Sequence, residues 1–231
     1  MIAAMAPRAI LVDALGTLLT IENPVPRLVA LMGERHAIEV APAAAATALA
    51  AEMSFYREHC IQASDAERLQ ALRLDCAEIV ARELGGEARS LAPAALLETL
   101  LDSLRFTPFP EVAATLARWR TDGAKVVVAS NWDVSLHTVL RDSGLRELLD
   151  GVVTSAEVGA SKPSGEVFTA ALSLADAEPW QAAHVGDSLR EDVEGATAAG
   201  IEAVWLLRRT SRAPATAAPP GVRVIASLDE F

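Results

Sequence analysis

The sequence predicts an α/β protein, in which a doubly wound (Rossmann-like) parallel sheet core carries an inserted all-helical cap domain. Three observations lead to this prediction. Short apolar runs alternate with amphipathic helical stretches along most of the chain. Some of these runs, such as residues 126–129, are continuously apolar, which is typical of a parallel strand buried on both faces. One long segment, residues 20–105, has helical periodicity and no convincing strand.

The predicted sheet is built from apolar runs that have the length of strands. Most are followed by an amphipathic stretch, so the strands should pair in parallel, with helices on both faces of the sheet. The expected strands are Ala9–Val12, Lys125–Ala129, Gly151–Thr154, Ala183–Val185, Glu202–Leu206 and Val222–Ile225. Residues 212–221, rich in Ala and Pro, are expected to form a surface loop before the last strand.

The inserted segment is expected to contain four helices in a bundle-like arrangement. Proline or a capping side chain marks where each one begins, since these residues favour the first helical turn. The helix starts are at Pro24 and Pro26, at Pro42, at Asp65 and at Pro93. We therefore expect residues 1–19 and 106–231 to form the core and residues 20–105 to form the cap.

Composition narrows the function. The 231 residues are 52% apolar, enough for a sizeable buried core, and carry a formal charge of −11. This charge argues against nucleic acid and anionic membranes as partners, because both would be repelled. There is no apolar stretch of membrane-spanning length, and the first seven residues do not resemble a signal peptide, so we expect a cytoplasmic protein. Cys60 and Cys76 are expected to be buried, reduced thiols.

Polar side chains follow several of the predicted strands. Asp13 comes directly after the first strand, Ser130 and Asn131 follow the second, and Asp187 follows the fourth, with Asp192 five residues further on. Lys162 lies in the loop after the third strand, and it is one of two lysines in the chain. Ligands of open α/β sheets bind outside the carboxyl ends of the strands, so we expect these segments to form one site.

The order and spacing of these motifs resemble the haloacid dehalogenase superfamily of hydrolases. Its signature is a nucleophilic Asp in D-x-D-G-T-[LV], then a Ser or Thr, then a Lys, and finally G-D-x-x-x-x-D. The corresponding residues here are Asp13 with Gly16 and Thr17, Ser130, Lys162 before Pro163, and Gly186-Asp187 with Asp192. The resemblance covers the whole chain, because the helical insertion looks like the mobile cap of subfamily I.

The resemblance implies a Mg²⁺-dependent phosphatase that acts on a small phosphate compound. Asp13 would attack phosphorus and form an aspartyl-phosphate. Ser130 and Lys162 would be the other catalytic residues, holding phosphoryl oxygens as charge develops. Crowded carboxylates raise one another's pKa unless a cation neutralises them, and Mg²⁺ prefers oxygen ligands. The implied substrate-binding residues are Thr17, Asn131 and Lys162, and the implied metal ligands are Asp13, the main-chain carbonyl of Leu15, Asp187 and Asp192.

One position departs from the family pattern. Most phosphatases of the superfamily carry a second Asp two residues after the nucleophile, where it protonates the leaving group, and this chain has Leu15 there. We therefore expect weak activity that depends on the leaving group, since general acids contribute about 10²- to 10⁴-fold. Asp133, His36 or His59 are candidates for a replacement acid. The cap arginines Arg57, Arg68 and Arg73 are candidates to contact an anionic substrate.

Two alternatives follow from Leu15. Instead of a phosphatase, the chain would then be a catalytically impaired member of the superfamily with a binding role, or a 2-haloacid dehalogenase. The motif of the dehalogenases also has a non-acidic residue at this position. Asp187 and Asp192 argue against the dehalogenase, because bare carboxylates oppose an anionic haloacid. The insertion contains no lysine, which argues against Schiff-base phosphonate hydrolysis. The physiological substrate and the oligomeric state stay open at this point.

Overall fold

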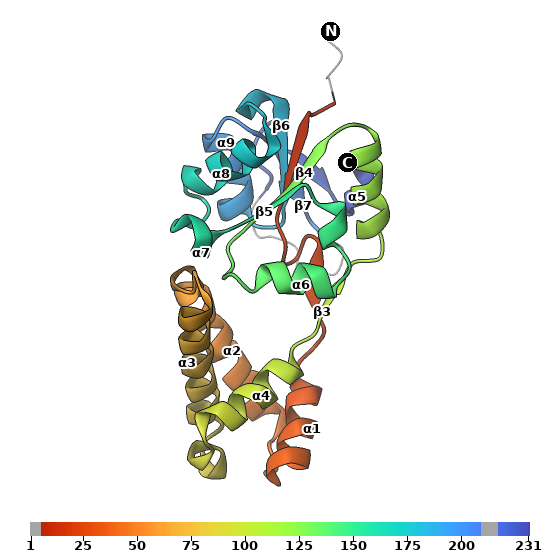
Figure 1. Ribbon diagram of the computed structural model, residues 1–231. Helices are drawn as coiled ribbons and strands as arrows, with labels where there is room; N and C mark the ends of the chain where they lie inside the picture. The colour runs from red at the N-terminus through yellow and green to blue at the C-terminus, as the bar shows by residue number, and fades with distance from the viewer. Residues whose placement is uncertain (1–5, 209–216) are drawn as a thin grey trace.

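The computed structural model describes residues 6–208 and 217–231. A parallel sheet with helices on both faces forms one half of the molecule, and four helices form the other (Figure 1). The order of the sheet is β5-β4-β1-β6-β7-β8, and every neighbouring pair is parallel. Its strands are β1 (Ala9–Val12), β4 (Lys125–Ser130), β5 (Gly151–Thr154), β6 (Ala182–Gly186), β7 (Glu202–Leu206) and β8 (Arg223–Ile225). The predicted fold class is therefore confirmed.

The helices begin close to the predicted positions. In the inserted segment they are α1 (Val25–His36), α2 (Pro42–His59), α3 (Ala66–Leu84) and α4 (Pro93–Ser103). In the rest of the chain they are α5 (Val112–Thr121), α6 (Leu136–Asp142), α7 (Ser155–Val158), α8 (Gly165–Ala175) and α9 (Gly195–Ala198). Asp65 caps α3 as expected, since its Oδ1 accepts a hydrogen bond from the backbone N–H of Arg68 at 2.9 Å.

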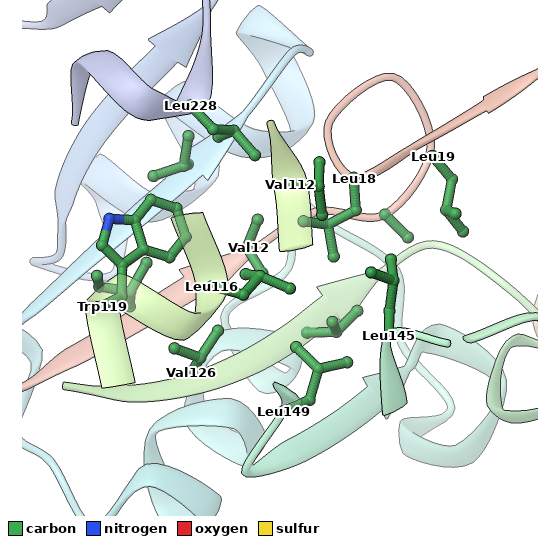
Figure 2. Packing of buried hydrophobic residues seen from close by; sticks show 14 of the residues in the cluster. Val12, Leu18, Leu19, Val112, Leu116, Trp119, Val126, Leu145, Leu149 and Leu228 are labelled. Atoms are coloured by element: carbon green, nitrogen blue, oxygen red, sulfur yellow. The ribbon is translucent and has the colours of Figure 1, made fainter. Parts of the chain in front are cut away.

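Alternate residues of β1 face opposite layers of helices, which is why this strand is apolar at every position. Ile10 and Val12 belong to an apolar cluster with α5 and α6. Ala9 and Leu11 belong to a second cluster with α8 and α9. Figure 2 shows the first cluster, in which Val112, Leu116 and Trp119 of α5 lie beside Val12 and Val126 of the sheet. A rigid, doubly covered sheet thus supports the strand ends that carry the polar residues.

A short antiparallel ribbon connects the two halves of the molecule. It consists of β2 (Leu19–Ile21) and β3 (Phe106–Pro108), with Thr20 paired to Thr107. The expectation that the segment from residue 20 has no strand is therefore wrong at Thr20 and Ile21. Strands of three residues are too short to show a period of two in the sequence, and their partners lie more than eighty residues apart in the chain.

The four helices of the insertion bury apolar side chains against one another. Their cluster includes Leu28 of α1, Leu49 of α2, Leu72 of α3 and Leu96 of α4. Cys60 and Cys76 belong to it and are free and buried, as predicted. Within residues 6–208 and 217–231, no helix has both the length and the apolar character needed to cross a bilayer. The expectations for residues 1–5 and for the first part of the 212–221 loop lie outside the described residues.

Candidate active site

The carboxyl ends of three adjacent strands bring the predicted residues together. β1 lies between β4 and β6, and Val12 pairs with Val128 on one side and with Val185 on the other. The next residue, Asp13, continues this register, because its backbone N–H donates to the carbonyl of Val185 at 3.0 Å. Parallel pairing therefore places Asp13 beside the ends of both neighbouring strands, where Ser130 and Asp187 follow.

Lys162 joins two of the acidic residues. Its Nζ donates to Oδ1 of Asp13 at 2.8 Å and to Oδ1 of Asp192 at 2.6 Å, and the residue is only 3% exposed. Burial alone would lower the pKa of Lys162, but the charges of Asp13 and Asp192 outweigh it and hold this pKa above its ordinary value. The lysine is thus a fixed positive charge at the centre of the site.

Asp13 is almost fully buried and is held through one of its oxygens. Oδ1 accepts hydrogen bonds from Lys162 and from Oγ of Ser130, the latter at 3.0 Å. Within the described part of the chain, Oδ2 accepts no hydrogen bond from the protein. Burial raises the pKa of Asp13, an effect that Lys162 opposes and the nearby Asp192 reinforces. One carboxylate oxygen is therefore anchored and the other is left for a ligand.

Asp192 is positioned by the turn that follows β6. The residue lies in a π-helical segment, η5 (Leu189–Glu194), and its Oδ2 accepts from the backbone N–H of Ser188 at 2.9 Å. Its Oδ1 also contacts Nε2 of His184 at 2.9 Å, on the buried face of β6. Burial would raise the pKa of Asp192, but Lys162 and His184 outweigh this and lower it. The buried His184 of β6 is therefore bound to a site residue.

Asp187 completes a cluster of three carboxylates. Oxygens of Asp13, Asp187 and Asp192 all lie within 4.8 Å of one another. Asp187 is exposed as a whole residue, but partial desolvation of its carboxylate, and then the charges of Asp13 and Asp192, raise its pKa to about 7. A Cβ atom on Gly16, whose φ is +85°, would overlap the Asp187 carboxylate. The glycine thus leaves room for the Asp187 carboxylate to approach the loop, and the three carboxylates are hard oxygen donors that fit a divalent cation such as Mg²⁺.

Two residues expected to bind substrate have other contacts. The side-chain amide of Asn131 accepts from the backbone N–H of Lys162 at 2.7 Å and donates to its carbonyl at 3.0 Å. Thr17 is fully buried and does not line the cavity above the site, and its Oγ1 has no hydrogen-bond partner among the described residues. Asn131 thus fixes the loop that carries Lys162, and Thr17 lies beneath the site.

Arg208, which belongs to none of the motifs recognised in the sequence, holds the loop after β1. Its Nε donates to the carbonyl of Gly16 at 3.1 Å, and its Nη2 donates to the carbonyl of Thr17 at 2.6 Å. Nη1 is paired with Glu111 at 2.6 Å, and the guanidinium lies 3.5 Å from the centre of the Phe109 ring. The available signal was its position two residues past β7, at the same edge of the sheet as Asp13 and Asp187.

A cavity of about 610 Å³ lies above the site, between the sheet and the four helices. Its floor includes Asp13, Leu15 and Lys162, and its far wall comes from α2, α3 and α4. Among the candidates for a replacement acid, Asp133 lines the cavity, where its Oδ2 accepts from the hydroxyl of Tyr56 at 2.8 Å. His36 and His59 do not line it. They contact Thr99 and the carbonyl of Phe55 instead.

A sequence model described as haloacid dehalogenase-like hydrolase matches residues 7–200, which is most of the chain. The chain belongs to this family of hydrolases. Among curated relatives, the bovine haloacid dehalogenase-like hydrolase domain-containing protein 3 is 46% identical over 88 residues, which are 38% of this chain and 35% of that protein. The phosphoserine phosphatase of Thermus thermophilus is 37% identical over 130 residues, 54% of this chain and 51% of the enzyme. The matched part thus spans about a third to a half of these relatives.

Solved structures match over nearly the full length of the chain. A HAD phosphatase from Thermococcus onnurineus superposes with a TM-score of 0.64 at 26% identity, covering 96% of this chain and 95% of that one. The L-2-haloacid dehalogenase of Xanthobacter autotrophicus gives a TM-score of 0.69 at 18% identity, covering 97% and 96%. The second likeness concerns the fold alone. Members of this family with different chemistry therefore share the architecture, and the side chains must decide the reaction.

Proposed function

We propose that this hydrolase is a Mg²⁺-dependent phosphatase of small phosphate compounds that works through an aspartyl-phosphate on Asp13. The observation that supports it best is the asymmetric anchoring of Asp13. Ser130 and Lys162 both donate to Oδ1, whereas Oδ2 accepts no hydrogen bond from the described residues, and Asp13 lines the cavity. A nucleophile that is held at one oxygen and free at the other is oriented for in-line attack.

The reaction needs two displacements at phosphorus. Oδ2 of Asp13 bonds to phosphorus, and the bond from phosphorus to the leaving oxygen breaks, with its electron pair going to the leaving group. Water then attacks phosphorus, the bond to Asp13 breaks, and inorganic phosphate and the free carboxylate are released. Lys162 and Ser130, already within hydrogen-bonding distance of Asp13, stabilise the negative charge on the phosphoryl oxygens.

Asp13, Asp187 and the main-chain carbonyl of Leu15 would hold Mg²⁺ directly. Asp192 would hold it either directly or through a bound water. The Oδ2 of Asp192 accepts one hydrogen bond, from Ser188, and keeps a lone pair for the metal or for a water bound to it. When bound, the ion neutralises the carboxylates and the charge of the phosphoryl group. The repulsion among three carboxylates that lie within 4.8 Å of one another is the physical reason why a cation would stabilise the cluster.

We also propose that residues 1–19 and 106–231 act as the catalytic core and residues 20–105 as a cap over it. The cap helices have an apolar cluster of their own, and they enclose the cavity whose floor contains Asp13. Leu15 lies half-buried in that floor, where it offers no proton to a leaving group. We therefore expect acyl phosphates, whose leaving groups need no acid, to be better substrates than alkyl phosphates.

The test is a phosphate-release assay on acetyl phosphate with and without Mg²⁺. We expect turnover that requires Mg²⁺ and is abolished by Asp13→Asn, whereas Asp122→Asn, at an exposed position at the end of α5, retains it. Beryllium fluoride should bind the native protein and not Asp13→Asn, because it mimics the phosphoryl group on a carboxylate. Turnover that persists in Asp13→Asn would refute the proposal.

Leu15 favours a second candidate, a 2-haloacid dehalogenase, in which Asp13 attacks carbon and no acid or metal is needed. The carboxylate of Asp187 opposes it, since it adds negative charge where a haloacid would bind. Halide release from 2-chloropropionate in the presence of a chelator would favour this candidate. Mg²⁺ binding without turnover of any phosphate compound or haloacid would instead favour a binding role.

A further inference from the structure

The wall of the cavity opposite Asp13 is apolar. It is formed by Met53 of α2 and by leucines on α4 and just after it, a set that we call the cap wall: Met53, Leu97, Leu100, Leu101 and Leu104. Leu101 is 37% exposed, and it is one of the large apolar side chains that the described structure leaves open to solvent. Leu97 and Leu100 also belong to the buried apolar cluster of the four helices, whereas Met53, Leu101 and Leu104 keep exposed surface at the cavity and require an explanation.

The sides of the cavity continue this apolar surface toward the site. Ile21 and Phe106 come from the connecting ribbon, Trp132 and Val139 come from the segment after β4, and Leu15 lies next to Asp13. A ligand whose phosphoryl group is at Asp13 would therefore have apolar side chains of both the sheet side and the cap within the same cavity. The volume of about 610 Å³ lies in the range of sites for medium-sized organic molecules and is far larger than a phosphate group needs.

The polar groups of the cap do not contradict an apolar occupant. Glu52 is buried in the wall, and burial raises the pKa of its carboxyl, which favours the neutral form. Arg73 is half-buried in the same wall, and Arg57 is exposed beside it. The cap thus contributes no exposed carboxylate to the cavity, and its two arginines favour entry of an anionic phosphate compound into a strongly acidic protein.

We propose that the substrate is a monophosphate whose leaving group is an extended apolar body that packs against the cap wall. This inference rests on the phosphatase function proposed above and adds the substrate class. The cap wall supplies binding through removal of apolar surface from water, while Asp13 and Lys162 act on the phosphoryl end. The length of the apolar body would therefore determine which monophosphates the enzyme prefers.

Saturated acyl phosphates test this without changing the chemistry of the leaving group. Acetyl, butyryl, hexanoyl and octanoyl phosphate have leaving groups of nearly equal pKa and differ only in apolar length. We expect kcat/KM to rise by about two- to fourfold for each added methylene, because burying one CH₂ favours binding by roughly that factor. A value of kcat/KM that is flat or falls along the series overturns the inference, although the phosphatase proposal survives.

Alkylphosphonates separate the two proposals, because they are not hydrolysed. We expect the affinity measured by calorimetry in the presence of Mg²⁺ to increase from methyl- to octylphosphonate, with a negative heat-capacity change. This increase supports the apolar contact even if no acyl phosphate is turned over, a result that would refute the phosphatase. Equal affinities along the phosphonate series would refute the apolar contact.

Variants of the cap wall locate the contact. Leu101→Gln and Met53→Gln place polar groups on half-exposed positions, so both proteins should fold, and each is expected to halve the gain per methylene or reduce it further. Leu174→Gln on α8 is the matched control, since Leu174 is 53% exposed and does not line the cavity. An unchanged dependence on chain length in both cap-wall variants would overturn the assignment.

Discussion

The two sides of the cavity are built in opposite ways. On the sheet side, Asp13, Lys162 and Asp192 are 7%, 3% and 1% exposed and are linked by charged hydrogen bonds. On the cap side, Leu101 is 37% exposed and Met53 is half-buried, and the wall has apolar contacts in place of ionic ones. One side is fixed by strong, directional interactions, and the other by contacts that are weak individually and non-directional.

This difference separates the two tasks of the proposed enzyme. Groups that stabilise transition-state charge work best when they are held in place before the reaction, and burial with paired charges holds them. Leaving groups vary in shape, and apolar contacts do not require one particular orientation, so an apolar wall can bind leaving groups of different shapes. Substitutions on the sheet side should therefore change both stability and chemistry, whereas substitutions on the cap side should change mainly selectivity. Four predictions test whether the two sides of the cavity differ in this way.

The largest effect is expected from Lys162→Met. The substitution leaves the buried carboxylates of Asp13 and Asp192 without their shared cation, which should lower the free energy of unfolding by about 3–5 kcal/mol. Turnover should fall by about 10²- to 10³-fold or more, because a donor to the phosphoryl group is lost. Urea unfolding and phosphate release measure the two effects.

The only other lysine of the sequence provides the control for that variant. Lys125 is exposed at the start of β4 and pairs with Asp150 at 3.1 Å. Lys125→Met should change the free energy of unfolding by less than about 1 kcal/mol, since exposed ion pairs contribute little. Equal losses in the free energy of unfolding would mean that the buried ion pairs of Lys162 stabilise the protein no more than the exposed ion pair of Lys125 does.

The second prediction concerns the missing acid. Leu15→Asp should raise turnover of alkyl phosphates by about 10²- to 10⁴-fold relative to acetyl phosphate, because a general acid assists poor leaving groups far more than good ones. Leu15→Asn, similar in size but without an acidic proton, should not change this ratio. A fall in alkyl phosphate turnover with Leu15→Asp would mean that another acid, such as Asp133, already serves.

The third prediction concerns the space beside Asp187. Gly16→Ala places a Cβ on a residue with φ of +85° and against the Asp187 carboxylate, so it combines backbone strain with overlap. We expect a loss of about 2–4 kcal/mol in the free energy of unfolding, with weaker Mg²⁺ binding. Gly123→Ala is the matched control, because Gly123 has φ of +93° and nothing within 4 Å of the added atom. It should cost only about 1–2 kcal/mol and leave Mg²⁺ binding intact. A similar free energy of unfolding and similar Mg²⁺ binding in the two variants would show that the Asp187 side chain can move to make room for the added Cβ.

The sheet side was largely predictable from the sequence, and the physical reason is register. The carboxyl ends of parallel strands meet at one edge, so an Asp after β1 and an Asp after β6 had to approach once the strands were recognised as neighbours. The apolar runs gave β1, β5 and β7 with the observed bounds because strands buried on both faces leave no polar interruption. The β2–β3 ribbon was not recognised, since three-residue strands carry too little pattern.

The contacts that orient the site could not be predicted in the same way. Arg208 donates to the main-chain carbonyls of Gly16 and Thr17. Every residue carries such a carbonyl, so the sequence does not indicate which ones Arg208 binds. His184 looks like any core residue of a strand until its neighbour Asp192 is placed by the π-helical turn. The cap wall could not be predicted for a related reason. Helical periodicity predicts which side chains of a helix are buried, but not which helices of the insertion line a cavity above the sheet.

The smallest expected effect belongs to the bond that joins the two sides. The hydroxyl of Tyr56, on α2, donates to Oδ2 of Asp133, which is 2% exposed in the segment after β4. Tyr56→Phe should lower the free energy of unfolding by about 1–3 kcal/mol, because it leaves a buried carboxyl oxygen without its donor. Asp133→Asn in the native and Tyr56→Phe backgrounds completes a double-mutant cycle. A coupling energy near zero would mean that this hydrogen bond does not help to hold the cap against the core, which are also joined by the backbone N–H of Val134 donating to the carbonyl of Ala63 at 3.2 Å. A coupling above about 0.5 kcal/mol would show that this hydrogen bond holds α2 against the core beside the cavity, and its loss should then raise KM for octanoyl phosphate more than it lowers kcat.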